Sequence, residues 1–217
     1  MDKESILSAI KLLRQNAAKR NFKQSIDLII NLKELDFKNP EQHVDFFMTL
    51  HNDRPKGLKV CAFVGPELFE SAKEACDTVI LLDEFSKYDN KKVAKKLADE
   101  HDFFIAQANI MAKIASTFGK VLGTRGKMPN PKAGCVVPPK TNLKPLVEKL
   151  RKTIRVSAKK EPIIHLLAGK EEMSDEVIAD NIHAIIEQLI HHLPAEKNNI
   201  RSVMIKYTMG KPVQIKF

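Results

Sequence analysis

A glycine-rich basic run at residues 119–127 invites a phosphate-binding interpretation. In a P-loop, backbone N–H groups cradle the phosphates and a lysine reaches the terminal ones. If Gly126 and Lys127 supplied its glycine–lysine pair, glycine would stand five positions earlier and serine or threonine would follow. Val121 and Met128 occupy those places instead. The run is also predicted to follow a helix rather than a strand, so a nucleotide-binding P-loop is not indicated.

The same run stands in a strongly basic part of the chain. The 217 residues include 36 Lys and Arg against 27 Asp and Glu, a net charge of +9. Residues 113–160 alone hold 13 basic side chains and one acidic side chain, Glu148. Such a one-sided cluster favours a polyanionic partner. Phosphate contacts are expected from Lys120, Arg125, Lys127 and Lys132, and a structural loop fixed by glycine and proline is the alternative.

The other chemistry-bearing residues do not indicate a catalytic or metal site. His191 and His192 are adjacent on a predicted helix, so their side chains point about 100° apart. The three cysteines are too widely spaced for a zinc site or a disulfide framework, so reduced and mostly buried thiols are expected. Acidic pairs near residues 83 and 171 precede predicted helices, where the helix dipole explains them. We expect no enzyme activity, no cofactor and no metal ion.

Composition limits the class of protein further. The hydrophobic fraction of 43% is enough for a buried core, and no apolar run approaches the roughly 20 residues that span a bilayer. The first residues carry mixed charges instead of the apolar stretch of a signal peptide. We therefore expect a cytoplasmic protein with no membrane partner.

The two ends of the chain have similar patterns of helix and strand. Near the N-terminus, residues 6–17 have apolar side chains at helical spacing, and residues 25–32 and 44–50 alternate as half-buried strands do. Toward the C-terminus, a long helix is expected after Ser174 as its N-cap, with strands at 162–167, 201–208 and 213–217. The ends are predicted to form one α+β domain of split β-α-β type, from residues 1–57 together with residues 154–217.

The middle of the chain has a different pattern. Short apolar runs without alternation are separated by helical segments, which is typical of a parallel sheet covered on both faces. The expected strands are 58–64, 78–82 and 103–107, and the expected helices are 67–75, 91–100, 109–122 and 143–152. Residues 58–153 are therefore predicted to form an inserted α/β, Rossmann-like domain, with a turn-rich boundary at 52–57.

A turn at residues 208–212, Thr-Met-Gly-Lys-Pro, is predicted between the last two strands. Gly210 would permit a positive φ and a close approach of the backbone. An exposed Met209 would offer a flexible apolar contact to a ribose or a base. The pattern alone favours an ordinary hairpin turn with Met209 folded inward.

Several separated motifs resemble those of the large-subunit ribosomal protein L-one family in its archaeal form. The run at 119–134, GKVLGTRGKMPNPKAG, is similar to the family signature Gly-x-x-Gly-x-x-Pro-Asn-Pro-Lys-x-Gly. Arg201-Ser202-Val203 followed by Thr208-Met209-Gly210 resembles a second hallmark. Asn21-Phe22-Lys23 and Ala179-Asp180-Asn181-Ile182 also match, so the resemblance covers essentially the whole chain.

This resemblance implies a function and a set of binding residues. It implies a protein that binds rRNA of the mobile stalk near the tRNA exit site, takes part in release of deacylated tRNA and represses translation through its own mRNA leader. It also implies a monomer outside the ribosome that is otherwise ribosome-bound in the cytoplasm. The implied RNA-binding residues are Asn21, Phe22, Lys23, Ser202, Lys206, Thr208, Met209 and Gly210, with His165 and Lys170 at a neighbouring strand end.

Charge and resemblance point to different parts of the chain. The implied RNA-binding residues lie in the weakly charged ends, whereas the basic cluster lies mostly in the inserted domain. We infer that the first group reads RNA shape and 2′-hydroxyls, and that the cluster adds a salt-sensitive second contact. Two alternatives stay open: a nucleotide-using enzyme with its ligand at the strand ends of the inserted domain, and a protein–protein module with an acidic partner.

Overall fold

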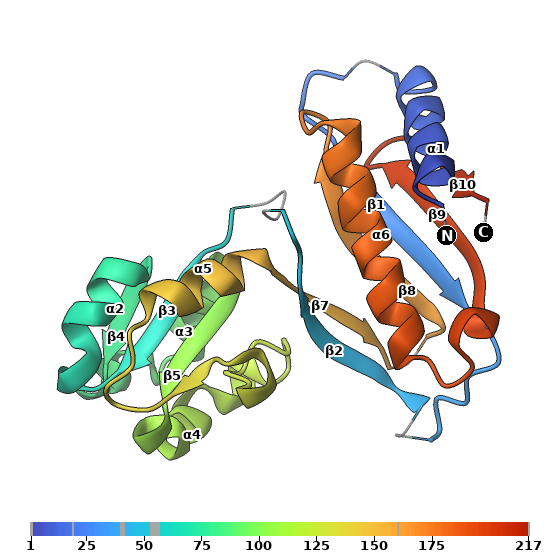
Figure 1. Ribbon diagram of the computed structural model, residues 1–217. Helices are drawn as coiled ribbons and strands as arrows, with labels where there is room; N and C mark the ends of the chain where they lie inside the picture. Colours follow the sequence, from blue (N-terminus) through green and yellow to red (C-terminus); the bar gives the residue numbers. More distant parts are fainter. Residues whose placement is uncertain (1, 19, 40–41, 53–56, 160, 217) are drawn as a thin grey trace. The chain divides into compact units, whose positions relative to one another are not determined.

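The computed structural model describes residues 2–18, 20–39, 42–52, 57–159 and 161–216 (Figure 1). The chain divides into two compact units. The first contains Met1–Pro55 together with Lys152–Phe217, and the second contains Lys56–Arg151. The chain therefore leaves the first unit after residue 55 and returns to it at residue 152.

The first unit is built on a four-stranded antiparallel sheet with the strand order β10-β9-β1-β8. Its strands are β1 (Ser25–Leu32), β8 (Ile163–Lys170), β9 (Ile200–Tyr207) and β10 (Val213–Ile215). Alternate residues of β1 are buried and half-buried, as expected for a strand with one face on the core. Because β8 and β9 both run antiparallel to β1, they are parallel to each other on either side of it.

Two helices cover the buried face of this sheet, α1 (Lys3–Gln15) and α6 (Asp175–His192) (Figure 1). The longer helix, α6, connects β8 to β9, so β1 splits a β-α-β unit. It begins directly after Ser174, as predicted, but the Ser174 side chain makes no capping hydrogen bond. Asp175 and Glu176 in the first turn still complement the helix dipole.

A two-stranded antiparallel sheet pairs β2 (Val44–Thr49) with β7 (Thr153–Ala158). Strand β7 was not predicted, because its alternation of buried Ile154, Val156 and Ala158 with Arg155 and Ser157 is short. That arginine donates to both carboxylate oxygens of Asp45, at 2.8 and 3.1 Å. The Lys159 ammonium lies 2.7 Å from the same carboxylate. The two cations together lower the pKa of Asp45 to about 2.

The second unit is a parallel sheet with the strand order β4-β3-β5-β6. Its strands are β3 (Val60–Val64), β4 (Thr78–Leu81), β5 (Phe103–Gln107) and β6 (Val136–Val137), and its helices are α2 (Phe69–Ala75), α3 (Lys91–Glu100), α4 (Met111–Leu122) and α5 (Lys144–Lys152). The predicted mixed α/β content and the parallel sheet are confirmed. Since β4 and β5 lie on opposite sides of β3, right-handed crossovers place α2 on one face and α3 and α4 on the other.

The cysteines and the helices are relevant to two classes of protein that the sequence does not indicate, metal-binding proteins and membrane proteins. Cys61 and Cys135 are buried and Cys76 is half-buried, and all three are free. Burial raises the pKa of Cys76 and of Cys135 to about 11. Within the described ranges, no three His, Cys, Asp or Glu side chains gather in a way that could hold a metal ion. None of the described helices is long and apolar enough to cross a membrane.

Candidate nucleic-acid interface

Three segments meet at the end of the four-stranded sheet where β1 begins and where β8 and β9 end. Ser25 lies opposite Lys170, and Ile26 lies opposite Tyr207. The residues before 25, after 170 and after 207 are therefore neighbours. We call this end the loop surface, and it brings together seven of the predicted residues: Asn21, Phe22, Lys23, Lys170, Thr208, Met209 and Gly210.

Two large apolar side chains are exposed on the loop surface. Met209 is 62% exposed and Phe22 is 50% exposed. The pattern-based expectation that Met209 folds inward is therefore wrong. A shallow hollow of about 350 Å³ lies beside Phe22, lined by Arg20, Asn21, Phe22, Lys23 and Glu171. An exposed aromatic ring with polar neighbours can take a base on its face and hydrogen-bond the base edge.

The turn after β9 is anchored to the core. The Gly210 N–H donates to the Tyr207 carbonyl oxygen at 2.9 Å, and Tyr207 is almost fully buried. A Cβ atom at Gly210 would lie 3.0 Å from the Tyr207 Cβ, so a side chain here would require a small shift of the turn. The positive φ expected at Gly210 is wrong, because the described glycines with positive φ are Gly126 and Gly134.

Backbone and side-chain bonds join the same turn to the loop before β1. The Thr208 N–H donates to the Ser25 carbonyl oxygen at 3.1 Å, and the Ser25 N–H donates to Thr208 Oγ1 at 3.2 Å. The Met209 N–H donates to Gln24 Oε1 at 3.4 Å. Gln24 is buried, and the sequence analysis missed it because its partner is 185 positions away.

The turn after β8 is tied to the same loop by Glu171, which the sequence analysis also missed. Glu171 Oε2 accepts from the Gln24 N–H at 3.1 Å, and the Glu171 N–H donates to the Gln24 carbonyl oxygen at 3.0 Å. Lys23 forms an ion pair with Glu172 across the same gap. Much of the Lys23 charge is thereby compensated within the protein.

Arg14 of α1 fixes the β8–α6 turn from the helical side. Its guanidinium donates to the carbonyl oxygens of Glu171 at 2.9 Å and Met173 at 2.6 Å, and to Asp175 Oδ1 at 2.6 Å. Planar guanidinium groups hold several acceptors in a fixed geometry. The loop surface is therefore held in shape before any ligand binds.

Ser202 lies away from the loop surface. It stands opposite Asn31 and accepts a hydrogen bond from Asn31 Nδ2 at 2.8 Å. Thr208 lies six positions further along the chain, which corresponds to about 20 Å along a strand. Lys206 lies between them and links the loop surface to the outer face of the sheet, which is the face opposite α1 and α6.

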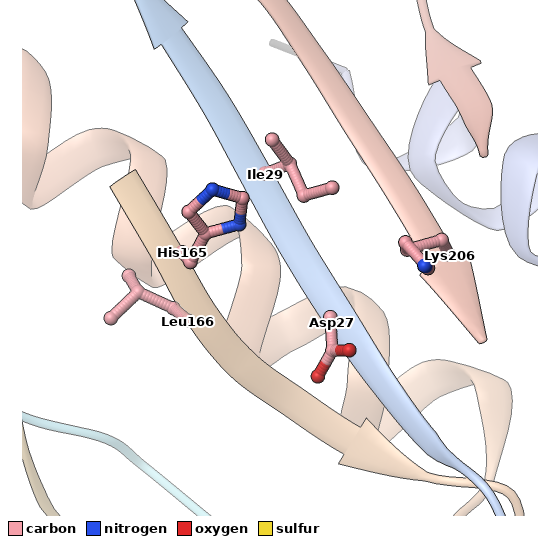
Figure 2. A pocket seen from close by; sticks show the side chains of 5 residues that line it. All are labelled: Asp27, Ile29, His165, Leu166 and Lys206. Atoms are coloured by element: carbon pink, nitrogen blue, oxygen red, sulfur yellow. The ribbon is translucent and has the colours of Figure 1, made fainter. Parts of the chain in front are cut away.

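His165 and Lys206 line a pocket of about 360 Å³ on this outer face, with Asp27, Ile29 and Leu166 (Figure 2). His165 lies opposite Ile29 in the middle of β8, so its expected position at the strand end beside Lys170 is wrong. Burial raises the pKa of Asp27, and the charges of Lys206 and His165 partly oppose that rise. The pocket therefore offers both hydrogen-bond donors and acceptors to a bound nucleotide.

Two of the four basic residues predicted to contact phosphate bind the protein itself. Lys127 Nζ donates to the carbonyl oxygens of Ala98 and His101, both at 2.7 Å. These carbonyls lie at the C-terminal end of α3, where helical acceptors lack intrahelical partners. Lys127 therefore acts as a C-terminal cap of α3, a role that the sequence did not predict.

Arg125 binds the same end of α3. It makes two bonds to the Asp99 carboxylate and donates to the Lys95 carbonyl oxygen at 2.9 Å. Lys120 and Lys132 differ, because their side chains are exposed and neither has an ion-pair partner among the residues that the structure describes. These two keep an ammonium group available to a ligand.

In the alternative of a nucleotide-using enzyme, the ligand would lie at the strand ends of the second unit. β3 and β5 meet there, and the Gly65 N–H that would face a phosphate donates to Gln107 Oε1 at 2.8 Å. Gln107 is buried, and its Oε1 would lie 3.1 Å from a Cβ atom at Gly65. This N–H is therefore already satisfied, which argues against the nucleotide-using alternative.

Known proteins share this sequence over nearly its whole length. Residues 13–211 match the ribosomal protein L1p/L10e family. The large ribosomal subunit protein uL1 of Methanothermococcus thermolithotrophicus is 46% identical over 216 residues, which cover 99% of each chain. The protein of the same name from Pyrococcus horikoshii is 40% identical over 99% of this chain and 96% of its own. The protein of the same name from Methanothermobacter thermautotrophicus is 39% identical over 98% of this chain and 99% of its own.

Proposed function

The chain belongs to the ribosomal protein L1p/L10e family, and we propose that it is a component of the large ribosomal subunit that binds RNA through the loop surface. In this proposal it binds rRNA of the mobile stalk near the tRNA exit site and takes part in release of deacylated tRNA. It also represses translation by binding its own mRNA leader. It is a monomer outside the ribosome, is ribosome-bound in the cytoplasm, and has no catalytic role.

The observation that carries this proposal is the exposure of Phe22 and Met209 on a loop surface that is otherwise held rigid. Stacking of one base on an aromatic side chain contributes about 1–3 kcal/mol. The network of Gln24, Glu171 and Arg14 fixes the loops in advance, so little conformational entropy is lost when RNA binds. Half-buried polar groups at Lys206 and Ser202 extend the contact along the outer face.

The mixed charge of the loop surface predicts how binding depends on salt. The carboxylates of Glu172 and Asp27 lie beside Lys23 and Lys206, so counterion release contributes less here than it would at the basic cluster of residues 113–160. Specific binding should therefore persist at moderate salt. A purely electrostatic contact would weaken steeply under the same conditions.

The proposal is tested by Met209→Asp, with Leu12→Asp as the matched control. Both change an exposed apolar side chain to a carboxylate, but Leu12 lies on α1, outside the three segments that form the loop surface. A central contact is typically worth about 2–4 kcal/mol, so Met209→Asp should weaken binding to an rRNA stalk fragment by about 30-fold or more. Equal affinities of the two variants would reject the loop surface as the binding site.

The proposed repression gives a second test of the same surface. If one surface serves both RNAs, Met209→Asp must lose binding to the mRNA leader as well as to the rRNA fragment. Phe22→Ala should weaken both by a similar factor. Loss of only one of the two would show that a different surface binds the other RNA.

A further inference from the structure

Helix α3 presents four lysines to solvent, Lys91, Lys92, Lys95 and Lys96. We call them the α3 basic face. The residues that α3 buries are Ala94, Leu97 and Ala98, so the lysines lie on the outward side of the helix. Side chains four positions apart are neighbours on a helix, which places the four ammonium groups over two consecutive turns. They lie outside residues 113–160, and the sequence analysis did not single them out.

The stability of α3 does not account for these lysines. Lys91 with Lys95 and Lys92 with Lys96 are like-charge pairs at i,i+4, which are unfavourable. The first turn contains no acidic residue, and cations there oppose the helix dipole. Favourable cations for this helix, Lys127 and Arg125, are bound at its other end.

The charge of the α3 basic face is also left uncompensated by its surroundings. Across the described ranges, Lys91, Lys92 and Lys95 have no acidic side chain within 4 Å, and Lys96 reaches Glu100 only at 4.0 Å. Asp99, the other acidic residue of the helix, is already bound by Arg125. The face is therefore open to an external anion.

We propose that the α3 basic face binds the phosphate backbone of double-helical RNA without reading its bases. This inference rests on the proposed function in that the chain acts on RNA, but it concerns a second surface in the other unit. Charge complementarity carries it, because ammonium groups one helical turn apart suit successive phosphates.

The neighbouring side chains favour a duplex over a single strand. Proteins that bind single strands without sequence preference stack bases on exposed aromatic rings. Of the large hydrophobic side chains exposed within the described ranges, the one on α3 is aliphatic, Val93. Backbone contacts from lysines need no such platform, and a duplex offers phosphates while its bases stay stacked.

The test uses the full chain with Met209→Asp, so that specific binding by the loop surface does not mask the second contact. Its partner variant also carries K91Q, K92Q, K95Q and K96Q. Binding to a perfectly paired RNA duplex is measured over a series of salt concentrations. Each phosphate contact adds about 0.9 to the slope of log affinity against log salt, so the slope should fall by up to about 3.6.

A charge-matched control separates this contact from the effect of net charge. The variant K11Q, K33Q, K38Q and K197Q removes four exposed lysines from the first unit. In the chain that also carries Met209→Asp, this variant should keep a salt slope close to that of Met209→Asp alone. If both quadruple variants lower the slope equally, the α3 basic face is not a distinct site and the proposal is overturned.

Two further outcomes decide between partners and between the two proposals. If polyglutamate of matched charge displaces the α3 contact as well as duplex RNA does, an acidic protein is the better partner and the RNA proposal fails.

In a chain with Met209 intact, the α3 changes should leave the preference for the stalk fragment over a scrambled hairpin unchanged. A lost preference would assign the specific site to α3, whereas failure of Met209→Asp alone rejects only the loop surface. Unchanged circular dichroism and thermal midpoint would exclude unfolding as the cause.

Discussion

Replacing Lys127 distinguishes its two possible roles. The sequence analysis expected the Lys127 ammonium to contact phosphate, whereas the structure places it on the carbonyl oxygens of Ala98 and His101, both at 2.7 Å. Lys127→Met keeps the length of the side chain and removes the charge. If the ammonium caps α3, the substitution must lower the stability of the second unit.

The expected magnitude follows from the two bonds. A hydrogen bond that involves a charged group contributes about 1.5–3 kcal/mol, and the cation adds about 0.3–1 kcal/mol through the helix dipole. Lys127 is only half-buried, so water can replace part of each bond. We expect a loss of about 2–4 kcal/mol in the free energy of unfolding. Lys132→Met, at an exposed lysine, should change it by less than about 0.5 kcal/mol.

Urea unfolding of the full chain is the appropriate assay, followed by tyrosine fluorescence. Tyr88 lies in the second unit and Tyr207 in the first, and the chain has no tryptophan. Tyr88→Phe therefore identifies which transition belongs to which unit. If Lys127→Met and Lys132→Met unfold at the same urea concentration, the capping role of Lys127 is refuted. A salt slope of RNA binding reduced only by Lys127→Met would then support the phosphate contact.

Three other changes test separate parts of the structure. Asp45→Asn should cost about 2 kcal/mol near neutral pH. Because the folded pKa is lowered to about 2, the difference from the parent should persist above about pH 4 and vanish as the pH falls through about 2, as urea unfolding at several pH values would show. Gly210→Ala adds a methyl group 3.0 Å from the Tyr207 Cβ. By shifting the turn it should weaken RNA binding about tenfold, while the thermal midpoint of unfolding should change little. Removing the four charges of the α3 basic face should raise the free energy of unfolding of the second unit by about 0.4–1 kcal/mol, because two like-charge i,i+4 pairs are lost; a decrease in calorimetry would contradict this.

Local signals predicted the elements where one pattern dominates. Helix α3 spans the predicted residues 91–100, and the Asn90 side chain caps it by accepting the Lys92 N–H at 3.0 Å. The apolar runs of the central strands β3 and β5 were equally clear, since both faces of these strands are buried. Strand β7 was missed because its alternation is short and its partner strand is far away in the sequence, as the pairing of Arg155 with Asp45 across 110 positions shows.

In the candidate site, too, some residues could be predicted from the sequence and others could not. Phe22 and Met209 were identified by family resemblance, whereas the pattern of residues 208–212 alone placed Met209 inward. Gln24, Glu171 and Arg14 carry no local signal, because each acts on partners about 150 or more positions away. The capping contact of Lys127 was not predicted for a related reason: a basic side chain in a glycine-rich loop can cap a neighbouring helix, and only the tertiary structure shows which carbonyls are within reach.

The central claim is that a rigid, weakly charged loop surface reads a specific RNA fold. The measurement that tests it most directly is the affinity of the purified protein for a large-subunit rRNA stalk fragment and for a scrambled hairpin, at several salt concentrations. The account predicts tight binding to the stalk fragment that persists at moderate salt, with much weaker binding to the scrambled RNA. Weak and equal binding to both RNAs, lost as salt is raised, would contradict it and leave only a general affinity for polyanions.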